Sequence, residues 1–238
     1  MKIRSTIVLC LVLMFSTWIR ADEINDEIKN VDPWEGWNRK VFAFNDALDK
    51  AVLRPLAKGY IYITPGPVEG GISRMFGNLG EILNTFNDLL QGKFKQAGND
   101  TGRFLINSTL GLAGFFEVAD KMGLPQAEGE DFGQTLGSWG VGSGRYIVLP
   151  LLGPSSLRDA PSRIVDTFLN PIYYIDDVPL KNSLYGASII STRADLLDAE
   201  ELLQGDKYSL MRDAYLQRRQ HLILDGEVED DFGDFEDY

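Results

Sequence analysis

The sequence predicts a mainly helical fold with at most one or two short strands. Apolar residues recur every three or four positions through most of the chain, which is the spacing of one helix face. The chain also holds 24 glycines and 10 prolines, which interrupt that pattern, so the helices are expected to be short. Only residues 60–64 and 146–149 have the composition of strands. The length of 238 residues favours one domain.

The two ends of the chain differ in composition from its middle. Residues 1–21 combine a basic start, an apolar run of about half the length of a membrane span and small residues near Ala21, which is typical of a cleaved signal peptide. Residues 22–31 are charged and aperiodic, as in a tether. Residues 226–238 hold seven acids and are expected to be disordered. A helical domain over residues 32–225 remains.

The start and stop signals place the helices in order. Asp32 is a candidate N-cap with Pro33 at the first helical position, and the first helix is expected to end before Pro55. Further helices are predicted over residues 68–76, 79–90, 94–110, 115–122, 158–169, 181–197 and 208–224, with a short piece capped by Asp198.

Charge and cysteine content limit the class of partner. The formal net charge is −12, and loss of residues 1–21 would make it more negative, which argues against a nucleic-acid partner. Cys10 is the only cysteine, and it lies inside the apolar run after Leu9. A lipid-attachment cysteine normally follows a small residue, so an apolar filler is the favoured interpretation and lipidation the alternative.

The groups that most enzymes use are scarce. His221 is the sole histidine and no serine stands in a G-x-S-x-G context, so neither a hydrolase triad nor an ordinary zinc or haem site is expected. Among the acids of residues 128–133, Glu130 or Asp131 fits a helix cap, and the pair Asp176 and Asp177 fits a turn, better than acid–base catalysis or calcium binding. Asp159, beside Arg158, is expected to form an ion pair or to cap a helix rather than to act in catalysis. The sequence therefore predicts no enzyme activity and no cofactor.

Several predicted helices are apolar on more than one face. The segments NTFNDLL and RFLINSTLGLAGFF carry few charges. Such helices either pack in a large soluble core or lie against lipid. No segment after the signal approaches 18 consecutive apolar residues, so the lipid alternative means short helices lying within one leaflet.

One long run resembles a known family. DPWEGWNRKVFAFNDALDKAVLRP resembles the opening signature of the MlaA family, also called VacJ. FGNLGEILNTFNDLLQGK, RFLINSTLGLAGFFEVADKMGLP, DFGQTLGSWGVGSGRYIVLPLLGPSSLRD and YLQRR resemble its later blocks in the same order. The resemblance spans residues 32–221. Cys10 and Arg145 depart from it, since the family usually has a lipidated cysteine after its signal and often a proline at the position of Arg145.

The resemblance implies a ring-like bundle of short amphipathic helices in the inner leaflet of a Gram-negative outer membrane, at its periplasmic face. Such a protein binds a trimeric outer-membrane porin. It removes mislocalised phospholipid from the outer leaflet through an amphipathic channel and hands it to a soluble periplasmic phospholipid carrier, which maintains lipid asymmetry. The alternative is a soluble periplasmic lipid-binding or scaffold protein without membrane insertion.

The same resemblance suggests roles for particular residues. A hinge loop beside the channel is expected at Gly140, Gly142 and Gly144, the alternative being an ordinary surface turn. The candidates for the lipid path or its rim are Asn38, Arg39, Arg103, Asn107, Trp139 and Tyr146. For Arg103 and Asn107, one turn apart, an internal ion pair is the alternative to a phosphate contact. Phe42, Phe44 and Asn45 are expected to fix the first helix in place.

Overall fold

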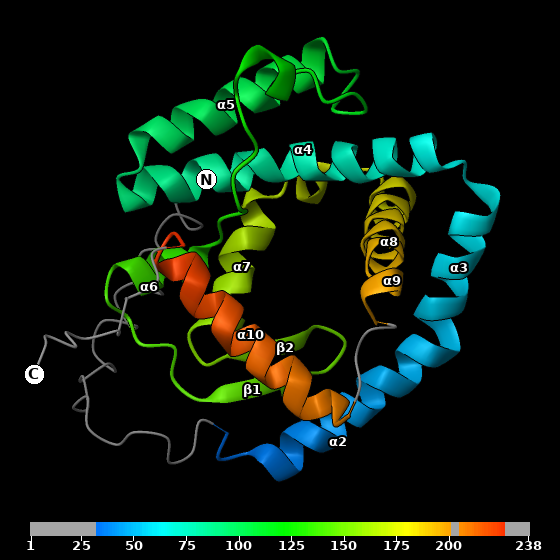
Figure 1. Ribbon diagram of the computed structural model, residues 1–238, viewed down its shortest axis with the longest axis vertical. Helices are drawn as coiled ribbons and strands as arrows, with labels where there is room; N and C mark the ends of the chain where they lie inside the picture. The colour runs from blue at the N-terminus through cyan, green and yellow to red at the C-terminus, as the bar shows by residue number, and fades with distance from the viewer. Residues whose placement is uncertain (1–31, 201–204, 227–238) are drawn as a thin grey trace, which may run out of the picture.

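The computed structural model describes residues 32–200 and 205–226 and confirms the mainly helical fold (Figure 1). The predicted signal peptide, the tether and residues 227–238 lie outside the described residues. The elements are α2 (Glu35–Leu48), η1 (Asp49–Leu53), α3 (Arg54–Ile63), α4 (Gly66–Gln91), α5 (Phe94–Thr109), η2 (Asp120–Met122), α6 (Phe132–Ser138), β1 (Tyr146–Leu149), β2 (Gly153–Ser156), α7 (Asp159–Leu169), η3 (Pro171–Tyr174), α8 (Val178–Asp195), α9 (Leu197–Glu200) and α10 (Lys207–Ile223).

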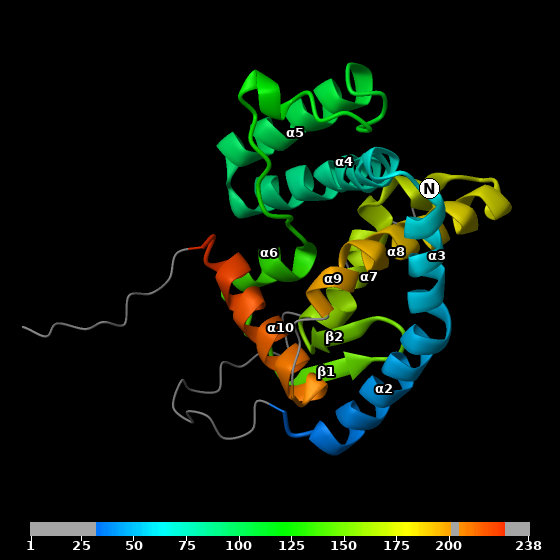
Figure 2. The same ribbon diagram turned by 45° about the vertical axis from the view of Figure 1, so that its right-hand side comes forward.

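The helices follow one another around a ring. In Figure 1, α2 and α3 form one curved side, α4 runs across the top, and α7, the two strands and α10 complete the circuit, with α8 and α9 beside α3. Helix α5 packs along the side of α4 that faces away from the ring, and Figure 2 shows the same hairpin projecting from the rest. The hairpin is therefore an addition to the ring rather than part of its circuit.

The first side of the ring is one nearly continuous helix. Its predicted end before Pro55 is wrong, because α2 passes through the π-helical turn η1 into α3. Pro55 comes just after the end of η1, so the proline, which has no N–H to donate, stands where the regular α-helical hydrogen bonding is already interrupted by the π-helical turn. The predicted strand at residues 60–64 is wrong for a related reason. Ala57 is fully buried against Ala194 and Leu197, so packing on α8 and α9 keeps this stretch helical.

Two further helix predictions fail in the α4–α5 region. Helix α4 is a single element of 26 residues rather than two, because Gly77 lowers helix propensity by only about 1 kcal/mol and packing on α5 outweighs it. Residues 115–122 form turns with one short 3₁₀ turn. The side-chain oxygen of Asn107 accepts hydrogen bonds from the N–H groups of Val118 and Ala119, both at 2.9 Å, and this turns the chain back.

The two strands form an antiparallel hairpin in which Tyr146 faces Ser156 and Leu149 faces Gly153. The prediction of β1 is confirmed, whereas β2 has the sequence GPSS and gives no strand signal. Helix α2 holds β1 through two asparagines seven residues apart on one helix face. Asn38 donates to Tyr146 O (3.2 Å) and accepts from Val148 N (2.9 Å). Asn45 donates to Leu149 O (2.9 Å).

We expect Asn38→Leu to lower the free energy of unfolding by about 3 kcal/mol. The change keeps the volume but leaves the Val148 N–H and the Tyr146 C=O buried without partners. Thermal and urea unfolding of the purified protein measure the change. Asn182→Leu, at an exposed position of α8, is the matched control and should stay within about 0.5 kcal/mol of the parent. Equal stability of the two variants would contradict the assigned role of Asn38.

Candidate functional site

Polar side chains occupy much of the interior of this protein, and large apolar side chains occupy much of its surface. The buried polar set includes Asn38, Asn78, Glu81, Asn87, Asp88, Asp100, Arg103, Asn107, Thr135 and Asp159. The exposed apolar set includes Trp37, Phe44, Tyr62, Ile63, Phe94, Leu110, Leu112, Phe116, Leu151, Leu152 and Tyr174. Tyr62 is 90% exposed and Ile63 77%. A protein folded for water alone normally has the opposite distribution.

The exposed apolar set lies on several separate elements. It includes the end of α3, the α4–α5 hairpin with the turn after it, the tip of the β-hairpin, and η3. Among the described helices, none is both long and apolar enough to cross a membrane.

The glycine loop, residues 140–144, connects α6 to β1. Gly140 (φ +86°) and Gly144 (φ +66°) have left-handed backbone conformations, whereas Gly142 does not. Arg158 fixes both sides of Gly142, since its Nη1 donates to Val141 O and its backbone N donates to Ser143 O, each at 3.1 Å. Gly142 itself is exposed, and a methyl group there would meet no atom within 4 Å. The hinge role of the loop stays a prediction.

The two aromatic candidates beside this loop have different environments. Trp139 is 53% exposed, and its Nε1 donates to Leu90 O (3.1 Å), so it ties the end of α6 to α4. Tyr146 is buried among Tyr208 and Tyr215, and burial raises the pKa of Tyr146 to about 12. The structure places Tyr146 in the small apolar core with Val41 and Val148, and its role on the lipid path stays a prediction.

The candidates on α2 also separate. Asn38 is fully buried and its side chain serves β1, so it is not available at a channel rim. Arg39 is exposed; it donates to Glu35 (2.6 Å) and Asp206 (2.8 Å) and lies over the ring of Tyr208. It thereby joins α2 to α10, as a rim residue or as a surface ion pair.

Among the three helix-fixing candidates, Phe42 and Asn45 have interior contacts. Phe42 packs edge-on against Tyr208 at a centroid distance of 5.6 Å, and Asn45 holds β1. Phe44 differs from the expectation. It is 55% exposed and belongs to the exposed apolar set.

Arg103 and Asn107 lie between α4, α5 and the segment after α5. Arg103 is 1% exposed and donates to Glu81 (2.9 Å), Glu117 (2.8 Å) and Leu124 O (2.7 Å). Asn107 donates to Glu117 at 3.2 Å. Each guanidinium nitrogen of Arg103 therefore has a protein partner. Of the two possibilities raised by the sequence, an internal ion pair and a phosphate contact, the structure has Arg103 in the internal ion pair. Both residues border a polar pocket of about 210 Å³.

A second buried acidic group ties the same two helices. Asp88 on α4 is fully buried, and neither of its carboxylate oxygens has a partner other than the facing carboxyl group of Asp100 on α5. Burial, followed by the charge of Asp100, raises the pKa of Asp88 to about 8. The carboxyl group of Asp88 therefore keeps its proton to a higher pH than an exposed aspartate does.

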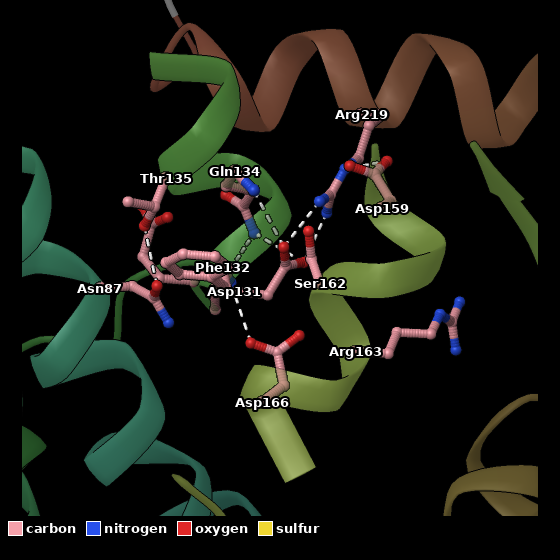
Figure 3. A network of polar contacts seen from close by, with 12 residues as sticks. Asn87, Asp131, Phe132, Gln134, Thr135, Asp159, Ser162, Arg163, Asp166 and Arg219 are labelled. Atoms are coloured by element: carbon pink, nitrogen blue, oxygen red, sulfur yellow. Dashed lines mark hydrogen bonds and ion pairs between the residues drawn. The ribbon is translucent and has the colours of Figure 1, made fainter. Parts of the chain in front are cut away.

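A network of ion pairs around Arg219 attaches the last helix, α10, to the ring (Figure 3). Arg219 on α10 lies between Asp131, the N-cap of α6, and Asp159 on α7, at 2.6 Å and 2.9 Å. Burial alone would raise the pKa of Asp159, but hydrogen bonds from Arg158 and Tyr215 lower it to about 2. Asp166 accepts from Phe132 N (2.9 Å), and burial followed by the charge of Asp131 raises the pKa of Asp166 to about 6.

The local predictions about two acids, Asp131 and Asp159, are confirmed. Asp131 caps α6 by accepting from Gln134 N, as expected for one of the acids of residues 128–133. Asp177 differs from the turn expected of it, since it caps α8 by accepting from Leu180 N. Asp159 pairs with Arg158 at 2.7 Å. Sequence reasoning did not identify Arg219 as the partner of Asp131 and Asp159, because 88 and 60 residues of chain separate them and no local spacing reports such pairs.

His221 is 47% exposed, and its Nε2 lies 3.7 Å from a carboxylate oxygen of Glu128. Within residues 32–200 and 205–226, no group of three or more potential metal ligands is close enough together to hold an ion.

The fold and these networks define a helical ring protein with polar groups buried between its elements and large apolar side chains exposed. The chain belongs to the MlaA lipoprotein family, whose model matches residues 30–222. The "Intermembrane phospholipid transport system lipoprotein MlaA" of Escherichia coli is 36% identical over 213 residues, covering 87% of this chain and 84% of that protein. An uncharacterised protein of Rickettsia bellii is 34% identical over 228 residues, covering 88% and 89%.

A solved structure agrees with the family assignment. It was reported as "Structural basis for maintenance of bacterial outer membrane lipid asymmetry", has a TM-score of 0.71 and 35% sequence identity to this chain, and the match covers 81% of this chain and 98% of that one. The family predicted from the sequence blocks is thus confirmed.

We expect Gly144→Ala to destabilise the glycine loop more than Gly142→Ala does. The first variant forces a side chain into a left-handed conformation and places its Cβ 3.1 Å from Leu157, whereas the second does neither. The difference in the free energy of unfolding should be about 1–2 kcal/mol, measured by thermal unfolding. Equal stability of the two variants would contradict this geometry.

We expect Asp88→Asn to flatten the pH dependence of stability. The folded-state pKa of Asp88 is raised, so its proton stabilises the native state at low pH, and that contribution is lost as the pH rises from about 4 to about 8. Across this window, the free energy of unfolding of the asparagine variant should rise relative to that of the parent, by at most about 1.4 kcal/mol per pH unit. Urea unfolding at pH 5 and pH 8 measures this, with the exposed Asp176→Asn as control. A difference in the free energy of unfolding between variant and parent that stays constant from pH 5 to pH 8 would contradict the raised pKa of Asp88.

Proposed function

We propose that this protein is the outer-membrane component of a phospholipid transport system that maintains lipid asymmetry. It takes mislocalised phospholipid from the outer leaflet and delivers it to a soluble periplasmic carrier. The observation that carries the proposal is the combination of a polar interior with an exposed apolar set in a member of the MlaA lipoprotein family. The Escherichia coli relative and a Haemophilus influenzae relative are both named as lipoproteins of an intermembrane phospholipid transport system, which supports phospholipid as the substrate.

The exposed apolar set supports insertion into one leaflet. Each large side chain left in water forgoes roughly 1.5–3 kcal/mol of burial, and lipid restores that gain. The described helices are too short or too polar to span a bilayer, so they would lie within a leaflet, with the ring held together by its own polar contacts. A polar interior also suits the passage of a head group, because an uncompensated polar group in hydrocarbon is costly.

The remaining roles follow from the same proposal. Gly142, between two anchored residues, would let the glycine loop move while Arg158 holds its ends. Trp139 and Arg39 remain candidates for the rim, since both are exposed beside elements that close the ring. Association with a trimeric porin is part of the proposal and accounts for a portion of the exposed apolar set.

Cell fractionation separates this proposal from the alternative of a soluble periplasmic protein. We expect the native protein in the outer membrane, released only by detergent and together with a porin. Intact mass of the recovered chain then distinguishes cleavage after Ala21 from lipidation at Cys10. Recovery in the soluble periplasmic fraction would contradict membrane insertion.

Complementation tests the transport role. In Escherichia coli cells lacking their own relative, the parent chain should lower the amount of outer-leaflet phospholipid that an added phospholipase reaches. Gly142→Pro should abolish this rescue at normal protein level, because proline restricts the loop, whereas Gly142→Ala should retain it. His221→Ala should also retain it, since the proposal includes no covalent chemistry. Full rescue by Gly142→Pro would exclude the hinge, and no rescue by the parent would count against the function.

A further inference from the structure

A polar pocket opens between α4, α5 and the segment that follows α5. Its volume of about 210 Å³ is many times the 10–15 Å³ that one ordered water needs. The lining includes Ser73, Arg74, Gly77, Asn78, Arg103 and Glu117. The pocket therefore has room for a small polar group, and charged groups of both signs line it.

The two arginines of this pocket differ in their partners. The guanidinium of Arg103 is saturated by Glu81, Glu117 and Leu124 O. Arg74 is half-buried and donates from Nε to Phe115 O (3.0 Å), while no carboxylate of the described residues lies within 4.0 Å of its guanidinium. Its terminal nitrogens are thus available as a planar fork of donors, the arrangement that binds phosphate.

An acceptor is also available in the pocket. The Oδ1 atom of Asn78 is buried and has no hydrogen-bond partner among the described residues, and Asn78 itself is 5% exposed. Glu117 is 30% exposed at its side chain, and both its bonds, to Arg103 and Asn107, use Oε1. Its Oε2 atom is therefore an acceptor suited to an ammonium group, whereas Asn78 Oδ1 has almost no accessible surface and is closed off from the pocket space.

We propose that this pocket binds a phosphoethanolamine head group, with the phosphate on Arg74 and the ammonium on Glu117. The inference rests on the proposed function for the identity of the lipid. Two arginines and two glutamates balance in charge around the pocket, so a zwitterion fits and a net anionic head group is opposed by Glu81 and Glu117. A choline head group lacks the N–H donors that this acceptor requires.

The surroundings of the pocket suit the rest of the lipid. Leu112 and Phe116 are 65% and 51% exposed on the same segment that carries Phe115 and Glu117. Acyl chains can lie against these side chains while the head group enters the pocket.

Titration of the full-length protein in detergent tests the site. The probes are dihexanoyl phosphatidylethanolamine, phosphatidylglycerol and phosphatidylcholine, together with free phosphoethanolamine, followed by calorimetry. We expect the ethanolamine lipid to bind at least 10-fold more tightly than the other two lipids. Free phosphoethanolamine should bind more weakly but compete for the same site; competition by inorganic phosphate alone, with equal affinity for the three lipids, would contradict the ethanolamine contact.

Variants locate the binding in the pocket. Arg74→Gln should lower the affinity for the ethanolamine lipid about 10-fold or more. Glu117→Gln should make the affinities for the ethanolamine lipid and for phosphatidylglycerol equal. Gly77→Leu should block the pocket, because a Cβ at Gly77 meets no atom within 4 Å and the longer side chain extends into the space. Gly80→Leu, on the same helix outside the lining and equally free of contacts, is the matched control and should bind normally.

The outcomes separate this proposal from the proposed function. If the parent binds phospholipid but Gly77→Leu and Arg74→Gln bind as the parent does, the pocket is excluded and the transport role stands. If the parent binds no phospholipid of any head group and also fails to rescue the deficient cells, the proposed function falls with it. Unfolding curves of each variant identify any that lose binding through misfolding, and Arg74→Lys, which keeps the charge without the fork, then replaces Arg74→Gln.

Discussion

The structure depends on one constraint: its elements are joined mainly by buried polar groups, and each of these groups needs a partner. The buried apolar clusters are small, one around Tyr146 and Tyr208 and another around Ala57 and Ala194. Arg219, Arg103 and Asn38 instead join elements far apart in the chain. A buried ion pair contributes little net stability, but it requires a defined geometry, because removal or displacement of one partner leaves the other as an unpaired buried charge. The ring is therefore specified by pairing more than by the volume of a core.

This constraint explains where sequence reasoning succeeded. Helix periodicity located α5, α7, α8 and α10 to within a few residues, because each has a clear start or stop signal. Asp131 was identified as a candidate cap because a cap acts over three residues of chain. Signals of this kind are local, and the sequence displays them directly.

The failures have the opposite character. The continuation of the first helix through Pro55, the helical state of residues 60–64 and the single helix α4 all depend on contacts with distant elements. The candidates Asn38 and Tyr146 looked like site residues because polar and aromatic side chains at a predicted passage suggest contact with a ligand. Their burial against β1 and α10 could be known only once those elements were placed. The same holds for Arg103, whose partners come from α4 and from the turns after α5.

Building the interior from polar pairs has a consequence for a protein in apolar surroundings. A soluble helical protein gains its stability by withdrawing apolar side chains from water, and it would lose that driving force in lipid. Charge pairs such as Arg219 with Asp131 and Asp159 strengthen where water is excluded, since the local dielectric constant falls. Contacts of this kind can keep a ring of short helices together in a leaflet, where exposed residues such as Tyr62 and Ile63 need no protein partner. The same exclusion of water makes an unpaired polar group costly, so a polar ligand that pairs with the unmatched terminal donors of Arg74 would be bound more strongly there than at a site open to water.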